Sequence, residues 1–238
     1  MAFNPNDHKI VSTSSRYMPV VLLLDVSGSM DGDKIENLYD ATVKMIETFA
    51  DQSRKEIPYK VAIITFGANV DCHTRYTDAK DLKNLSRFYA NGMTPLGAAL
   101  RMAKAMLEDP DETKKKWYRP AVVLVSDGYP NDDYQGPLND FINNGRTARC
   151  QRVSMGIGDD ADYGMLETFA SEDVDGITGM AKFCFKAEDA GDIVRVFKLI
   201  SASIQNSVQQ NPNDVPGATS RGSASRSKRV ADPDDDLL

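Results

Sequence analysis

The sequence predicts a single α/β domain with a Rossmann-like, doubly wound and mostly parallel sheet of six strands. Three observations indicate this fold class. Apolar β-type runs alternate with stretches of helical spacing from about residue 19 to residue 206. Some of these runs are unbroken, which is typical of strands buried on both faces. The chain has 238 residues, 41% of them hydrophobic, which is enough for one well-buried core.

Six strands are expected along the chain. They are Val20–Asp25, Tyr59–Phe66, Val70–Tyr76, Ala121–Ser126, Cys150–Gly156 and Ala181–Phe185. The second and third strands are separated by three residues, Gly67, Ala68 and Asn69. This connection is too short for a parallel crossover. These three residues are typical of a hairpin turn, so the third strand is predicted to be an antiparallel edge strand.

Helices are expected between the strands because apolar residues recur there at helical spacing. The predicted helices are Lys34–Ser53, Leu96–Glu108, Gly136–Arg149, Tyr163–Ala170 and Ala190–Gln209. Strands that alternate with helices imply right-handed crossovers, which place helices on both faces of a parallel sheet.

The ends of the chain differ in composition from this domain. We expect an N-terminal extension over residues 1–18, the domain over 19–207 and a disordered polar tail over 208–238, which is rich in Pro, Gly, Ser and charge. The N-terminus lacks the pattern of a secretory signal and no apolar run has membrane-spanning length. Three widely spaced cysteines without a C-x-x-C motif favour a reducing, cytoplasmic location. The net charge of −7 argues against nucleic acid as the main partner.

The end of the first strand carries the most informative chemistry. Residues 20–30 read VVLLLDVSGSM, so an apolar run ends in Asp25, and Ser27 and Ser29 follow at once. Open α/β folds bind ligands at the carboxyl edge of the sheet, where this loop would emerge. A carboxylate and two hydroxyls on one tight loop suit Mg²⁺, Mn²⁺ or Ca²⁺ rather than zinc or copper.

Two other segments are expected to complete this loop. Thr94 precedes a predicted helix, in the loop or at its N-cap, with Pro95 at the first helical position. Asp127 directly follows the fourth strand, which commonly lies beside the first strand where the winding of such a sheet reverses. Two adjacent carboxylates repel each other unless a cation lies between them. The predicted metal-site residues are therefore Asp25, Ser27, Ser29, Thr94 and Asp127.

These five residues, in this order, resemble the metal-ion-dependent adhesion site of von Willebrand factor A domains. The resemblance covers roughly residues 19–207 and implies that Ser27, Ser29 and Thr94 contact the metal directly. It implies that Asp25 and Asp127 act mainly through water. An acidic residue of a protein partner would fill the open coordination position, so we expect a non-enzymatic protein-binding module. Met30, Tyr129 and Tyr134 follow the metal loops and are candidates for the rim of that contact.

Within this family, the run TPLGAAL at residues 94–100 looks most like bacterial TerY-type proteins of the tellurium-resistance and stress group. Those proteins are associated with a protein kinase and a PP2C-type phosphatase. The resemblance therefore implies a scaffold or regulator in a stress-response or defence signalling system. The zinc-binding extension of TerY-type proteins is not evident, because the C-terminal tail has no cysteine or histidine.

Three other functions remain open or are disfavoured. An Mg²⁺-dependent phosphohydrolase could use Asp25 as nucleophile, but the second carboxylate expected two residues later is replaced by Ser27, and no catalytic lysine stands out. A subunit that works with an AAA-type ATPase, as in the metal chelatases, would share the same fold. A serine hydrolase triad is disfavoured because His8 and His73 are the only histidines.

Overall fold

The computed structural model describes residues 16–53, 57–173 and 178–210. β1 begins at Met18 and the last helix ends at Gln210. The predicted extension over residues 1–18 and the predicted disordered tail over 208–238 therefore fall almost entirely outside the described ranges, and both stay predictions.

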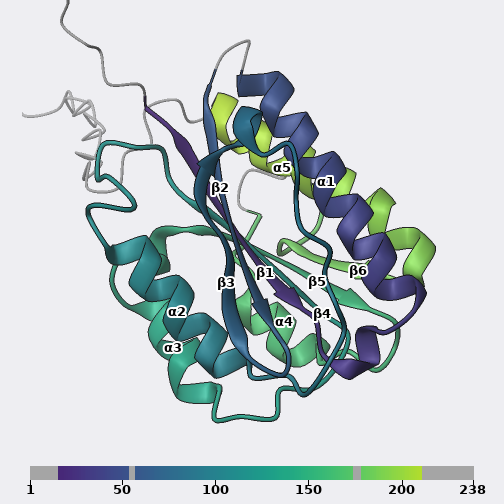
Figure 1. Ribbon diagram of the computed structural model, residues 1–238. Helices are drawn as coiled ribbons and strands as arrows, with labels where there is room; N and C mark the ends of the chain where they lie inside the picture. Colours follow the sequence, from purple (N-terminus) through teal and green to yellow (C-terminus); the bar gives the residue numbers. More distant parts are fainter. Residues whose placement is uncertain (1–15, 54–56, 174–177, 211–238) are drawn as a thin grey trace, which may run out of the picture.

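A six-stranded sheet in the order β3-β2-β1-β4-β5-β6 forms the centre of the molecule (Figure 1). The strands are β1 (Met18–Asp25), β2 (Tyr59–Phe66), β3 (Val70–Asp78), β4 (Ala121–Ser126), β5 (Gln151–Ile157) and β6 (Cys184–Ala187). β3 pairs antiparallel with β2, and all other neighbouring strands pair in parallel. The predicted fold class is confirmed, including the antiparallel edge strand and the contact between the first and fourth strands.

Helices cover both faces of the sheet. They are α1 (Asp33–Ser53), α2 (Leu96–Glu108), α3 (Gln135–Asn143), α4 (Tyr163–Phe169) and α5 (Ala190–Gln210). α1 and α5 lie together on one face, and α2, α3 and α4 lie on the other (Figure 1). Within the described ranges, no helix is both long enough and apolar enough to cross a membrane.

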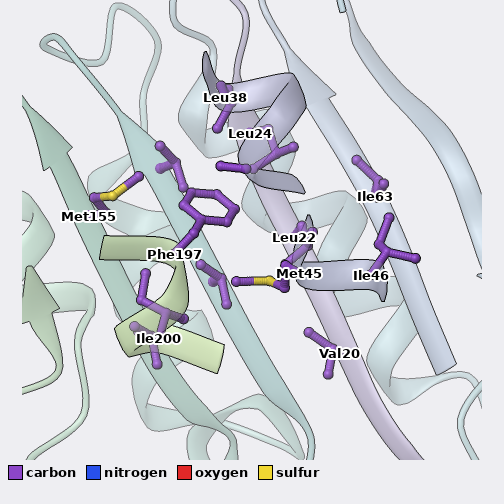
Figure 2. Packing of buried hydrophobic residues seen from close by; sticks show 14 of the residues in the cluster. Val20, Leu22, Leu24, Leu38, Met45, Ile46, Ile63, Met155, Phe197 and Ile200 are labelled. Carbon is purple, nitrogen blue, oxygen red and sulfur yellow. The ribbon is translucent and has the colours of Figure 1, made fainter. Parts of the chain in front are cut away.

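β1 is buried along its whole length because both of its faces are covered. Successive strand residues point to opposite faces, so its even-numbered apolar residues from 20 to 24 join the cluster under α1 and α5. Residues 21 and 23 join the cluster under α2, α3 and α4. Figure 2 shows Phe197 of α5 and Met45 of α1 packed over the first face. This packing holds the carboxyl end of β1, and with it Asp25, in a fixed place.

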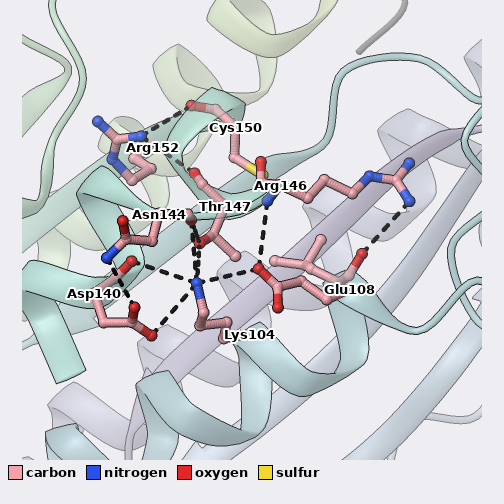
Figure 3. A network of polar contacts seen from close by, with 9 residues as sticks. Lys104, Glu108, Asp140, Asn144, Arg146, Thr147, Cys150 and Arg152 are labelled. Atoms are coloured by element: carbon pink, nitrogen blue, oxygen red, sulfur yellow. Dashed lines mark hydrogen bonds and ion pairs between the residues drawn. The ribbon is translucent and has the colours of Figure 1, made fainter. Parts of the chain in front are cut away.

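The helix predicted over Gly136–Arg149 is shorter in the structure. α3 ends before Gly145, whose φ of +66° is a left-handed conformation that interrupts an α-helix. The ammonium group of Lys104, on α2, then donates to the carbonyl oxygen of Asn144 at 3.1 Å (Figure 3). Thr147–Arg149 form a separate 3₁₀ turn. Residues 144–149, at the end of the predicted helix, therefore form a turn that is hydrogen-bonded to α2.

The last strand is displaced from its predicted position over Ala181–Phe185. The N–H of Phe183 donates to the carbonyl oxygen of Ser171 at 3.0 Å, so the chain before β6 pairs partly with the segment that follows α4. Regular pairing with β5 begins only at Cys184. The other predicted strands and helices end within about two residues of those in the structure.

Candidate metal centre

Asp25, the last residue of β1, is fully buried at the carboxyl edge of the sheet. Its Oδ1 accepts a hydrogen bond from the N–H of Ser27 at 2.8 Å, and its Oδ2 accepts one from the hydroxyl of Ser126 at 2.6 Å. Burial raises the pKa of Asp25 to about 6, and the charge of Asp127 acts in the same direction, against hydrogen bonds from Ser126 and Ser27. A cation at this edge would relieve the cost of keeping the Asp25 carboxylate ionised.

The serine loop is joined directly to the end of β4. The hydroxyl of Ser29 donates to Asp127 Oδ1 at 2.7 Å, and Ser27 Oγ lies 3.0 Å from Ser29 Oγ. Neighbouring ligands of an octahedral Mg²⁺, at bond lengths of about 2.1 Å, are about 3.0 Å apart. The two serine oxygens therefore already have the separation of two adjacent ligands. Ser27 and Asp127 are buried, whereas Ser29 is exposed, so the site opens to solvent at Ser29.

The loop that carries Thr94 is hydrogen-bonded to both of the other loops. The N–H of Gly28 donates to the carbonyl oxygen of Gly92 at 3.0 Å. Asn131 lies four residues after Asp127 and makes two hydrogen bonds with Thr94. Its side-chain Oδ1 accepts from the N–H of Thr94 at 2.9 Å, and its backbone N–H donates to the carbonyl oxygen of Thr94 at 3.1 Å. Thr94 itself is buried. The structure thus places all five predicted residues on three mutually bonded loops.

The start of α2 differs slightly from the prediction. Leu96 is the first helical residue and Pro95 is the N-cap, so Pro95 precedes the position expected for it and Thr94 lies in the loop. The carboxylate of Asp132 caps the helix by accepting from the N–H groups of Gly97 at 2.9 Å and Ala98 at 3.0 Å. A negative charge at this end of the helix is also favoured by the helix dipole. Asp132 thereby fixes the helix that follows Thr94.

Sequence reasoning missed a lysine in the site. The ammonium nitrogen of Lys34, on the first turn of α1, lies 2.6 Å from Asp127 Oδ2 and 3.3 Å from the carbonyl oxygen of Ser29. This lysine pairs with Asp127, but no contact among the described residues gives it a catalytic role. The sequence gives no signal for this contact, because it depends on how the start of α1 is placed against the end of β4.

Two exposed apolar side chains belong to the loops of the site. Met93 is 62% exposed and precedes Thr94, and Tyr129 is 69% exposed and lies two residues after Asp127. Met30 is fully buried, so the suggestion that it belongs to the contact rim is wrong. Its thioether instead joins the core beneath the serine loop. Tyr134 is partly buried and packs against the core under α2, α3 and α4. Tyr129 thus remains a rim candidate, and Met93 is one that the sequence prediction omitted.

The donor set of this site is mixed. Among the described residues, no three His, Cys, Asp or Glu side chains gather as a metal-binding group. Two carboxylates and several hydroxyls meet instead, and such oxygen donors fit Mg²⁺, Mn²⁺ or Ca²⁺. If the direct ligands are the neutral hydroxyls, a bound cation would keep most of its positive charge.

The fold and these loops define a doubly wound α/β domain with a cluster of hydroxyl and carboxylate groups at the carboxyl edge of its sheet. The profile of the von Willebrand factor type A domain matches residues 20–198, and the chain belongs to this family. Inter-alpha-trypsin inhibitor heavy chain H3 of Mus musculus is 26% identical over 182 residues, covering 72% of this chain and 19% of that protein. Inter-alpha-trypsin inhibitor heavy chain H4 of Homo sapiens is 26% identical over 161 residues. This match covers 63% of this chain and 17% of that protein. The chain thus spans about a fifth of the length of these relatives.

Solved structures show the same fold at low sequence identity. Proximal thread matrix protein 1 from the mussel byssus has a TM-score of 0.62 and 16% identity, covering 79% of this chain and 48% of that one. The vWF domain of the type V pili tip protein Mfa5 from Porphyromonas gingivalis has a TM-score of 0.61 and 12% identity. This match covers 82% of this chain and 97% of that one. Another structure of the mussel protein is described as having a zinc-occupied MIDAS (metal-ion-dependent adhesion site) motif. Its TM-score is 0.59 at 17% identity, and the match covers 79% of this chain and 48% of that one. None of these matches singles out TerY-type proteins.

Proposed function

We propose that this domain is a metal-dependent protein-binding module without catalytic activity. Ser27, Ser29 and Thr94 would contact a divalent cation, and Asp25 and Asp127 would hold it mainly through water. The observation that carries the proposal is the chain of contacts from Ser27 Oγ to Ser29 Oγ at 3.0 Å and on to Asp127 Oδ1 at 2.7 Å. When bound, the cation supplies an electropositive coordination position that accepts a carboxylate of a protein partner.

Mg²⁺ is the proposed ion, with Mn²⁺ or Ca²⁺ as alternatives, because all of the donors are hard oxygens. The zinc-occupied motif described for the mussel protein is a reason to include Zn²⁺ in any comparison of metals.

The geometry disfavours the phosphohydrolase alternative, even though Lys34 reaches the site. A nucleophilic carboxylate needs an oxygen that the substrate can approach. Asp25 is fully buried, and its two oxygens accept hydrogen bonds from Ser27 and Ser126. Such a carboxylate is suited to orienting the serine loop rather than to attacking phosphorus.

The partner is proposed to be a protein that presents an acidic side chain. A kinase and a PP2C-type phosphatase, a stress-response or defence role and a cytoplasmic location are the narrower proposals that follow from the TerY-like sequence features. An AAA-type ATPase partner is the alternative within the same fold. Co-purification of the tagged chain with Mg²⁺, followed by elution with EDTA, distinguishes these partners.

Calorimetric titration with Mg²⁺, Mn²⁺, Ca²⁺ and Zn²⁺ tests the metal site. The wild type should bind at least one of these ions, and Thr94→Ala and Ser29→Ala should lose most of that affinity without unfolding. Thr48→Ala is the matched control, because Thr48 carries an exposed hydroxyl on α1 that donates to the Lys44 carbonyl oxygen of the same helix. Equal metal affinity in all four proteins would overturn the proposal.

Peptide selection tests the carboxylate partner. A displayed random-peptide library is bound in the presence of the preferred ion and eluted with EDTA. Selected peptides should contain an acidic residue, and its replacement by the corresponding amide should abolish binding to the wild type. Purified protein should show no turnover of phosphomonoesters with Mg²⁺ or Mn²⁺, and turnover that is lost in Asp25→Asn would favour the phosphohydrolase.

A further inference from the structure

Lys34 places a fixed positive charge inside the candidate metal centre. Its ammonium nitrogen is 2.6 Å from Asp127 Oδ2 and 3.3 Å from the carbonyl oxygen of Ser29. The other oxygen of the same carboxylate, Asp127 Oδ1, accepts the hydroxyl proton of Ser29 at 2.7 Å. Asp127 therefore joins a lysine on one side to a metal-ligand candidate on the other.

The two members of this ion pair differ in their access to water. The side chain of Asp127 is 0% exposed, whereas that of Lys34 is 33% exposed. An ionised carboxylate that is removed from water needs a counter-charge or strong hydrogen bonds. Lys34 supplies that charge when no metal is bound. Its long stem and partial exposure also allow the ammonium group to move outward without disturbing the core.

We propose that Lys34 is the counter-ion of the metal-free site and that it sets the metal affinity by opposing the incoming cation. This inference rests on the proposed function. Two effects act in the same direction. The ammonium group repels a dication bound beside Ser29, and it draws charge from Asp127, so that the Ser29 oxygen is polarised less strongly toward the metal.

Lys34 should therefore raise the stability of the metal-free protein and lower the affinity of the site for the metal. With Lys34 present, the metal-free loops are held together and the cation binds moderately. Without its charge, the buried Asp127 carboxylate keeps the hydrogen bond from Ser29 but loses its counter-ion, and a bound dication would supply the missing positive charge. Lys34 thus limits the metal affinity while keeping the empty site folded.

The test compares three variants with the wild type. Lys34→Met keeps most of the side-chain volume and removes the charge, Lys34→Arg keeps the charge, and Lys44→Met makes the same change at an exposed position ten residues further along α1. Binding of Mn²⁺ and of Mg²⁺ is measured by calorimetry, and thermal unfolding is measured with EDTA and with Mn²⁺.

We expect Lys34→Met to bind Mn²⁺ about tenfold more tightly than the wild type, which corresponds to about 1.4 kcal/mol. Lys34→Arg and Lys44→Met should stay within about twofold. In EDTA, Lys34→Met should unfold at a lower temperature than the wild type, and Mn²⁺ should raise its unfolding temperature by more. Lys34→Gln, whose amide can still donate to Asp127, replaces Lys34→Met if that variant does not fold in EDTA.

Two results would overturn the inference and separate it from the proposed function. If the wild type and Lys34→Met bind Mn²⁺ with equal affinity, or if Lys34→Met binds more weakly, the role of Lys34 is refuted while the metal site stands. If none of the four proteins binds any of the tested ions, the metal site itself is refuted and the inference falls with it.

Discussion

Replacement of Asp25 by asparagine should stabilise the metal-free protein and abolish its metal binding. Burial raises the pKa of Asp25 from its ordinary value of 3.8 to about 6. Each pKa unit is worth about 1.4 kcal/mol, so keeping this carboxylate ionised at pH 7.5 costs the folded state about 3 kcal/mol. Asparagine has nearly the same shape and carries no charge.

The hydrogen bonds around residue 25 decide how much of this gain is realised. The amide oxygen of asparagine can still accept from the N–H of Ser27, and its NH₂ group can donate to Ser126 Oγ, which now donates to Asp25. Charge-assisted bonds are replaced by neutral ones, which are weaker. We therefore expect Asp25→Asn to raise the free energy of unfolding by about 1–3 kcal/mol in EDTA at pH 7.5.

Urea unfolding followed by circular dichroism measures this difference, and calorimetry measures the loss of metal binding. Asp40→Asn is the control, because Asp40 lies exposed on α1, and it should change the stability by less than about 0.5 kcal/mol. A loss of more than about 1 kcal/mol in Asp25→Asn would show that the ionised Asp25 anchors the fold, and the reasoning from its burial would be refuted.

Three further predictions concern pH, the cap of α2 and the core. Between about pH 4 and pH 6 the folded metal-free protein binds more protons at Asp25 than the unfolded chain does. In EDTA, the free energy of unfolding of the wild type should therefore fall relative to that of Asp25→Asn as the pH rises through this range. A difference between the two proteins that stays constant would contradict this. Asp132→Ala removes the acceptor of two N–H groups at the start of α2. It should lower the free energy of unfolding by about 1–2 kcal/mol and weaken metal binding. An unchanged urea midpoint and an unchanged metal affinity would show that Asp132 does not support the Thr94 loop. Phe197→Ala should lower the free energy of unfolding by about 3–5 kcal/mol and leave the metal affinity of the folded protein unchanged; a large loss of affinity in calorimetry would show that the core and the site are coupled.

Much of the fold follows from local sequence patterns. The apolar runs at β1 and β4 are buried on both faces, and this burial is what makes them unbroken. The adjacency of these two strands follows from the reversal of winding in doubly wound sheets, and it brings Asp25 near Asp127. The candidate site residues at or just after the ends of β1 and β4 could be named for the same reason. Thr94 follows no parallel strand, and its place beside them depends on the hydrogen bond from the Gly28 N–H to the Gly92 carbonyl oxygen.

The remaining features depend on contacts between distant segments. The early end of α3 requires Gly145 in a left-handed conformation and the contact of Lys104 with the following turn. The sequence predicts only that Lys34 begins a helix and that Met30 belongs to the contact rim. Their actual roles depend on the angle at which α1 leaves the serine loop, which no periodicity in the sequence encodes.

Anomalous diffraction from crystals soaked with Mn²⁺ would locate the proposed metal site. We expect one strong peak within bonding distance of Ser27 Oγ, Ser29 Oγ and Thr94 Oγ1, with the Asp127 carboxylate beside it. A peak elsewhere, or none at millimolar Mn²⁺, would contradict this expectation.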